Sequence, residues 1–153
     1  MFNQTAVQKV LEDRGGVLYW RKTGKKAGSL HHTGYIQISF NNKLYGAHRL
    51  MFMMHHGWVP EVIDHVDGNR ANNQIDNLRQ ATWSQNLQNM KLRPNNKSGC
   101  KNVSWCASKK KWVVQLSING RHTNLGRFDD LEFADLVATE ARNKYHGAFA
   151  RHL

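Results

Sequence analysis

Apolar and polar positions predict short, alternating elements over the first 58 residues. An amphipathic segment at residues 5–11 predicts a short helix, and residues 17–20, which follow two glycines, predict a strand. Residues 35–40 alternate strictly and lead through an Asn-Asn turn into residues 44–45, which predicts a hairpin. Apolar residues at helical spacing predict a helix over residues 47–56 that stops at a glycine, with its methionines in the core.

The next segment, residues 61–92, has a different pattern. A short apolar strand at residues 62–66 is broken by Asp67-Gly68-Asn69 and followed by a polar loop. A second short strand is expected at residues 75–79, and a polar helix at residues 83–91. The predicted order is therefore strand, loop, strand and helix.

The last part of the chain predicts a separate small module. Residues 93–98 have the composition of a linker. Residues 103–105 and 112–118 predict two strands, and Asn119-Gly120 is a strong hairpin signal before a third strand at residues 122–125. A helix is expected at residues 131–145. Three antiparallel strands packed on one helix give this part an α+β fold.

Composition narrows the class of protein. The chain has 153 residues, and 40% of them are hydrophobic, which is enough to form a core. It has no apolar run long enough to cross a membrane and no signal segment, and its two cysteines cannot form a disulfide framework. We therefore expect a cytoplasmic protein, within a bacterial cell if a phage encodes it.

Net charge indicates the partner. The formal net charge is +11, which favours a polyanion and nucleic acid first. The excess is concentrated in residues 91–127, which contain no acid and carry Lys91, Arg93, Lys97, Lys101, Lys109, Lys110, Lys111, Arg121 and Arg127. Residues 61–90, in contrast, contain more acids than bases. A chance fluctuation in a basic protein is the alternative explanation.

A group of polar residues in this less basic segment has the composition of a catalytic site. Asp64 and His65 are adjacent at the end of a predicted strand, and Asn77 and Asn86 follow. Carboxylate and amide oxygens suit a hard cation such as Mg²⁺, and a histidine with a near-neutral pKa can take a proton from water. Asn77 is placed to hydrogen-bond His65 and fix its tautomer. The alternative is that these Asx residues only stabilise turns, which applies most strongly to Asn69, Asn72 and Asn73.

This segment resembles the HNH (ββα-metal) endonuclease family, in particular its phage homing members. The resemblance rests on residues 63–69 (Ile-Asp-His-Val-Asp-Gly-Asn), Asn72-Asn73, residues 75–79 (Ile-Asp-Asn-Leu-Arg) and Asn86. It implies that His65 is the general base, Asn77 its orienting partner, and Asp64 and Asn86 the metal ligands. Asn86 stands where many members have histidine, which favours Mg²⁺, with Mn²⁺ as the second candidate.

The C-terminal part resembles the AP2/ERF DNA-binding fold. The resemblance rests on Ser98-Gly99, residues 101–103, residues 111–114, residues 124–129 and the start of the following helix. It implies that the polar face of the sheet enters the major groove. Ser and Asn stand where AP2 domains often have Arg and Trp, which favours backbone contacts over base reading, and an ordinary solvated sheet face is the alternative. The DNA-binding residues expected here and near the catalytic group are Arg70, Arg79, Lys101, Ser104, Lys109, Lys110, Lys111, Gln115, Ser117, Arg121, His122 and Asn124.

The sequence thus predicts a two-part α+β protein. Residues 1–92 would form an HNH nuclease domain, with a hairpin and helix leading into a ββα-metal core at 61–92, and residues 93–98 a linker. Residues 99–153 would form an AP2-like DNA-binding domain. We expect a metal-dependent endonuclease of homing type that nicks double-stranded DNA without a small-molecule cofactor, as a monomer, with a dimer as the alternative. A non-catalytic DNA-binding protein with a degenerate HNH fold is the alternative function. His48 is expected to be structural.

Overall fold

The computed structural model describes residues 2–152, which fold into several small antiparallel sheets and four α-helices. The chain divides into two compact units, one ending at Thr82 and the other beginning at Trp83. The predicted linker at residues 93–98 lies inside the second unit, and the domain limits stay a prediction. None of the helices in the described part of the chain is long and apolar enough to cross a membrane.

The first unit begins with helix α1 (Gln4–Val10), which Asn3 caps by accepting a hydrogen bond from the Ala6 amide. Strands β1 (Leu11–Arg14) and β2 (Val17–Trp20) form a hairpin. A three-stranded sheet follows, built from β3 (Ser29–Leu30), β4 (Ile36–Phe40) and β5 (Lys43–Gly46). Asn41 and Asn42 make the tight turn between β4 and β5 with positive φ angles, which asparagine tolerates better than most residues.

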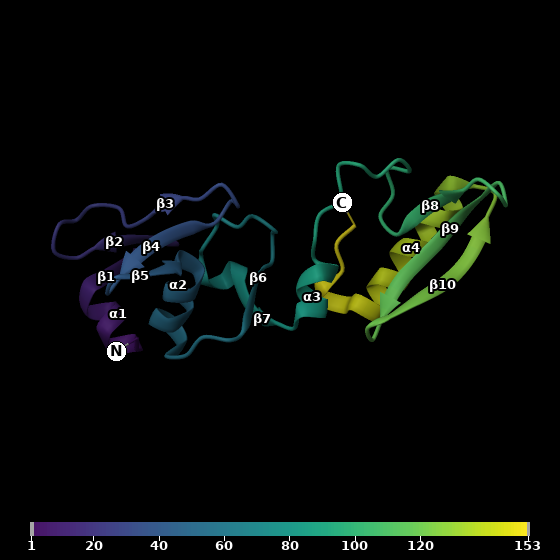
Figure 1. Ribbon diagram of the computed structural model, residues 1–153. Coiled ribbons are helices and arrows are strands. Elements are labelled where there is room, and N and C mark those ends of the chain that lie inside the picture. The colour runs from purple at the N-terminus through teal and green to yellow at the C-terminus, as the bar shows by residue number, and fades with distance from the viewer. Residues whose placement is uncertain (1, 153) are drawn as a thin grey trace. The chain divides into compact units, whose positions relative to one another are not determined.

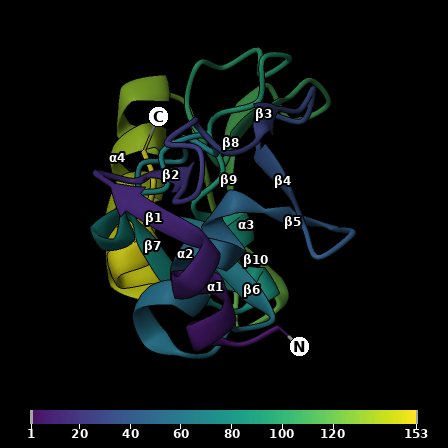
Figure 2. The same ribbon diagram turned by 90° about the vertical axis from the view of Figure 1, so that its left-hand side faces the viewer.

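Helix α2 (Ala47–His56) supplies most of the core of this unit. It lies beside α1 and against β4 and β5 (Figures 1 and 2), and ends at Gly57 in the left-handed conformation. Leu50 and Met51 are fully buried and pack in one cluster with Val7 and Leu11. The predicted place of the α2 methionines in the core is confirmed, since Met51, Met53 and Met54 are all buried.

The first unit closes with a two-stranded antiparallel sheet. Strand β6 (Val62–His65) pairs with β7 (Leu78–Ala81), and the short 3₁₀ turn η1 (Ile75–Asn77) precedes β7. Ile63 of β6 and Leu78 of β7 belong to the same core as α2. This packing fixes the end of β6, where the candidate catalytic residues lie.

The second unit starts with helix α3 (Trp83–Gln88) and then forms a sheet in the order β10-β9-β8. Its strands are β8 (Val103–Cys106), β9 (Lys111–Ile118) and β10 (Arg121–Phe128). Helix α4 (Leu131–His146) covers one face of this sheet (Figure 1), and the 3₁₀ turn η2 (Gly147–Phe149) follows it. Ala134 and Ala138 are small enough to let α4 approach Val103 and Val114 closely.

The element boundaries differ from the sequence prediction in a few places. Strands β1 and β3 were not expected, because they are short and lack strict alternation. The residues predicted as a strand from Ile75 begin as a 3₁₀ turn, and α3 ends three residues earlier than predicted. Strand β10 continues past Leu125 to Phe128 because a bulge between Asn124 and Gly126 keeps it paired with β9.

Candidate active site and nucleic-acid interface

Asp64 and His65 lie at the buried end of β6. The antiparallel register places Asp64 opposite Arg79 and His65 opposite Leu78. Asp64 is 3% exposed and His65 is 4% exposed. A buried carboxylate and a buried imidazole on adjacent residues are costly unless they are hydrogen-bonded or paired. The hydrogen-bond and ion-pair partners of these two side chains therefore indicate which chemistry the site can perform.

The loop that leaves β6 is organised around Asp67. Its carboxylate accepts hydrogen bonds from the Asn69 backbone amide at 2.7 Å, from Asn72 Nδ2 at 2.7 Å and from Asn77 Nδ2 at 3.0 Å. The Asn77 Oδ1 atom in turn accepts from the Asp67 amide at 3.0 Å. Burial opposes ionisation of Asp67, but these hydrogen bonds outweigh it and lower the pKa of the carboxyl. The network fixes the loop that leads from His65 back to β7.

Asn73 holds the His65 ring. The His65 Nε2 atom is 3.2 Å from Asn73 Oδ1, and the Asn73 amide nitrogen donates to the Ala71 carbonyl at 3.3 Å. Because that second bond orients the amide, Asn73 presents an acceptor to Nε2. The His65 proton therefore lies on Nε2, and Nδ1 is the basic nitrogen of the neutral ring.

The sequence prediction gave this orienting contact to Asn77, and the structure gives it to Asn73. The side chain of Asn77 is committed to Asp67 and to the Asn72 carbonyl, at 2.8 Å, so it shapes the loop instead. For Asn73 a turn-stabilising role was the alternative explanation, and the structure shows that it is 2% exposed. The sequence pattern included Asn73 in the HNH resemblance but gave it no role, because it meets His65 only when the loop closes.

Two aromatic rings surround His65. The ring centroids of His48 and Tyr35 lie 5.4 and 6.0 Å from that of His65. Desolvation lowers the pKa of His65, and the hydrogen bond that His65 donates to Asn73 opposes this effect. Burial, together with the neighbouring His65 and Arg49, lowers the pKa of His48 to about 4. Both imidazoles are therefore neutral near pH 7, the state that a general base requires.

Asp64 is paired across the sheet with Arg79. The Arg79 Nη2 and Nε atoms are 2.7 and 2.8 Å from Asp64 Oδ2. Arg79 was predicted to contact DNA, and in the structure its guanidinium binds this carboxylate. Its role toward DNA stays a prediction.

The predicted metal ligands differ in their placement. Asp64 offers a buried anionic oxygen beside His65, and Asn86 lies on α3, the first element of the second unit. Both are oxygen donors, which fit a hard divalent cation. Within residues 2–152 there is no group of three His, Cys, Asp or Glu side chains that could hold a metal ion. A site formed by Asp64 and Asn86 therefore stays a prediction.

Arg70 lies at the edge of the same site. Its guanidinium stacks over the Tyr35 ring, 5.0 Å from the centroid, and Nη1 donates to the Thr33 carbonyl at 2.9 Å. These contacts hold a positive charge on the loop that carries Asn73. The position suits a contact to a phosphate group near His65.

The predicted DNA-facing residues of the second unit gather on the sheet face opposite α4. The register pairs Gln115 with Asn124 and Ser117 with His122, so these side chains project on one side. Gln115, His122 and Asn124 are exposed, as is Ser104 on the same face, whereas Ser117 is half-buried. Val113 of β9 lies on this same face, opposite Ser104 of β8, but its side chain is buried.

The predicted cationic residues of this unit differ in their exposure and in their partners. Lys109 and Lys110 are exposed in the turn between β8 and β9, and Arg121 is exposed at the first position of β10. Lys111 pairs with Asp129 at 2.8 Å. Lys101 is turned inward, and its ammonium donates to the Gln88 and Met90 carbonyls at 2.8 and 2.6 Å. Its position at the end of α3 was not predicted, since it depends on a contact between segments 11 to 13 residues apart.

Comparison with known proteins identifies the family. Residues 45–88 match the HNH endonuclease family, a segment that runs from α2 through β6 and β7 to α3. The chain is 38% identical over 89 residues to Protein 3.8 of Escherichia phage T7, and the match covers 58% of this chain and 73% of the phage protein. No solved structure matches the chain significantly. The chain therefore belongs to the same family as phage T7 Protein 3.8, with an HNH endonuclease domain at residues 45–88.

Proposed function

We propose that this protein is a metal-dependent endonuclease that hydrolyses phosphodiester bonds in double-stranded DNA, with His65 as the general base. The observation that carries the proposal is the hydrogen bond from His65 Nε2 to a buried, oriented Asn73. That contact leaves Nδ1 as the basic nitrogen, and desolvation keeps the imidazole neutral near pH 7. Such a group can take a proton from an attacking water molecule.

The other residues of the site have supporting roles. Asp64 and Asn86 would hold one divalent cation, Mg²⁺ first and Mn²⁺ second, which when bound stabilises the negative charge that develops on the phosphate and the leaving oxygen. Asn77 and Asp67 are hydrogen-bonded to each other and keep the loop after β6 in place. This loop would hold the His65 ring in position beside the Asp64 carboxylate. Arg70 would bind a neighbouring phosphate and position the strand.

The second unit would supply DNA affinity in the manner of an AP2-like module. The exposed polar face of β9 and β10, with Lys109, Lys110 and Arg121 at its ends, fits the major groove, which admits a β-ribbon. Contacts would also come from Lys101, Lys111, Ser104 and the half-buried Ser117. We further propose a homing-type enzyme that nicks one strand as a monomer. The likeness to a phage protein supports action in the cytoplasm of a bacterial cell.

Nicking of supercoiled plasmid in Mg²⁺, with EDTA as the metal control, tests the catalytic proposal. Because general-base catalysis contributes about 10²–10⁴ in rate, we expect His65→Ala to lower nicking by that factor while DNA binding is retained. His32→Ala, at an exposed histidine of the same unit, is the matched control and should nick like the wild type. Undiminished nicking by His65→Ala would exclude His65 as the base. Binding without nicking by the wild type would favour the non-catalytic alternative.

A further inference from the structure

A cavity of about 490 Å³ lies in the second unit. Its walls are α3, the segment of residues 90–96, the loop at Lys101 and Asn102, and the facing ends of β9, β10 and α4. Ser117 and His122 line it and also belong to the predicted DNA-facing side of the sheet. The cavity is thus continuous with that face, and its volume lies in the range of about 300–1,000 Å³ that small-molecule ligands occupy.

All charged residues that line the cavity are basic. Lys91, Arg93 and Lys101 contribute cationic groups, and His122 and His146 contribute imidazoles. Burial, with Arg142 and Arg151 nearby, lowers the pKa of the Lys101 ammonium to about 8. The cationic groups of Lys91, Arg93 and Lys101 would attract a phosphate group.

The cavity also offers apolar contacts that a simple anion would not need. Leu87 and Met90 line it and are 61% and 42% exposed, and Leu92 lies next to them. Exposed side chains of this size are favourable partners for the flat face of a nucleobase. Phosphate-binding and base-binding chemistry therefore occur in one cavity.

His146 adds a hydrogen-bond acceptor. Its Nε2 atom lies 2.9 Å from the Ser117 carbonyl and must donate to it, so Nδ1 carries the lone pair. This Nδ1 atom is buried and has no hydrogen-bond partner among the described residues. A buried polar atom without a partner is uncommon in folded proteins. Because His146 lines the cavity, a shift of its ring would bring this acceptor to an N–H group of a bound base.

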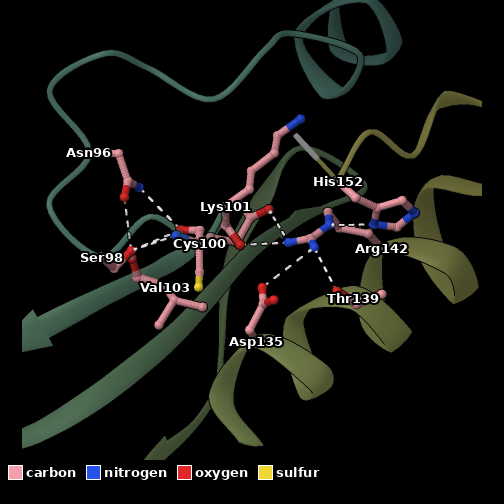
Figure 3. Close-up of polar contacts among 10 residues, drawn as sticks. Asn96, Ser98, Cys100, Lys101, Val103, Asp135, Thr139, Arg142 and His152 are labelled. Carbon is pink, nitrogen blue, oxygen red and sulfur yellow. Dashed lines mark hydrogen bonds and ion pairs between the residues drawn. The ribbon is translucent and has the colours of Figure 1, made fainter. Parts of the chain in front are cut away.

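The wall that carries Lys101 and Asn102 is braced from behind (Figure 3). Arg142 of α4, which is 1% exposed, donates to the Lys101 carbonyl and to Asn102 Oδ1, and its Nη2 donates to Thr139 Oγ1 at 2.8 Å. On the other side of this loop the Ser98 hydroxyl bridges the Cys100 and Val103 carbonyls. The wall is therefore preorganised, which reduces the entropy lost on binding.

We propose that this cavity binds one unstacked nucleotide of a DNA strand, with the phosphate on Lys91 and Arg93 and the base against Leu87 and Met90. The inference rests on the DNA-binding part of the proposed function and is independent of cleavage. A base that leaves the stack needs a pocket of this kind, and a base already in a single strand leaves the stack most easily.

A titration of the full ¹⁵N-labelled chain in EDTA tests which chemistry the cavity accepts. We expect thymidine 5′-monophosphate to shift the amide resonances of residues 87–93, 117 and 122, and inorganic phosphate at equal ionic strength to shift only those of residues 91–93. Identical shifts with both probes would overturn the base-binding part. The oligonucleotide dT12 should bind at least tenfold more tightly than the mononucleotide. Equal affinities would identify a site for free nucleotides and would also overturn the proposal.

Matched variants test whether the cavity is the site on the DNA strand. Arg93→Ala should weaken dT12 binding about tenfold, because it removes one phosphate contact in a partly desolvated site. Lys25→Ala removes one exposed charge from the first unit and should change the affinity less than twofold. Equal losses in the two variants would show that only net charge matters and would contradict the proposal.

A third variant separates this inference from the catalytic proposal. His65→Ala should bind thymidine 5′-monophosphate and dT12 as the wild type does, because His65 belongs to the other unit. If wild-type plasmid nicking fails while these probes bind, only the catalytic role of His65 is lost. If nicking is normal and the probes do not bind, only the nucleotide site is lost.

Discussion

The two units of this protein use polar residues in opposite ways. In the first unit Asp64, His65 and Asn73 are almost completely buried, and each polar group is directed by a specific partner. In the second unit the polar residues of β9 and β10 are mostly exposed, and Lys109 and Lys110 are exposed in the turn before β9. Acid–base chemistry needs a defined tautomer and a low dielectric, whereas binding along a charged polymer needs accessible charge. The difference is the one expected between the proposed catalytic site and the proposed DNA-binding surface.

The match to the HNH endonuclease family qualifies this comparison. The matched segment, residues 45–88, includes α3, which groups with the second unit. The C-terminal end of α3 is held there by Lys101, whose ammonium donates to the carbonyls of Gln88, the last residue of the helix, and of Met90. The segment that matches the family therefore extends into the second unit by helix α3.

The largest expected effect concerns the exposed charge. Replacing Lys109, Lys110 and Arg121 together with Gln should weaken duplex DNA binding about 100-fold at low salt and lower the slope of log K against log salt by about 2–3. Nicking at saturating DNA should be unchanged, because none of the three lies in the first unit. Filter binding at several salt concentrations measures the slope. An unaltered slope would show that the phosphate contacts are made by other residues.

The next effect concerns the buried imidazoles of the first unit. His48 has a folded-state pKa of about 4 against 6.5 for an unperturbed ring, so the unfolded chain binds more protons between those values. The contribution of His48 to the free energy of unfolding should therefore be complete above pH 6.5, and about 3 kcal/mol of it should be lost as the pH drops to 4. His48→Gln should be less sensitive to acid than the wild type in urea melts. Parallel pH curves for the two proteins would contradict this account.

A smaller effect is expected from the residue that orients the base. Asn73→Ala should lower the rate of nicking about tenfold with little change in KM, because it frees the His65 tautomer without altering the DNA contacts. Asn69→Ala, in the same loop but with its side chain bonded to the Ala71 amide, serves as the control and should lower the rate about threefold at most. A loss carried mainly by KM would assign Asn73 to DNA binding instead.

The smallest effect would show whether the units unfold independently. Asp130 caps α4, its carboxylate accepting from the Phe133 amide at 2.7 Å, so Asp130→Ala should cost about 1 kcal/mol of stability. Hydrogen exchange should speed up in β8, β9 and β10 and remain the same in α2. Equal acceleration in both units would mean that they unfold together.

Local signals predicted most of the elements because the forces involved act within a few residues. Asn119-Gly120 adopts the positive φ angles that its hairpin turn requires, and Gly57 ends α2 in the left-handed conformation. The short strands β1 and β3 were missed, since two to four residues carry too little periodicity. The α+β character and the HNH segment were both predicted from the sequence, and the AP2-like identity of the second unit stays a prediction.

By itself, the sequence determined the order of elements, the basic C-terminal block and the Asp-His pair at the end of β6, because each depends on neighbouring residues. Only the tertiary structure decided which groups meet. Asn73 rather than Asn77 contacts His65, Arg79 binds Asp64, and Lys101 turns back onto the end of α3. These contacts join residues 8, 15 and 13 positions apart. Their formation depends on strand register and loop closure, which the packing of the whole unit sets.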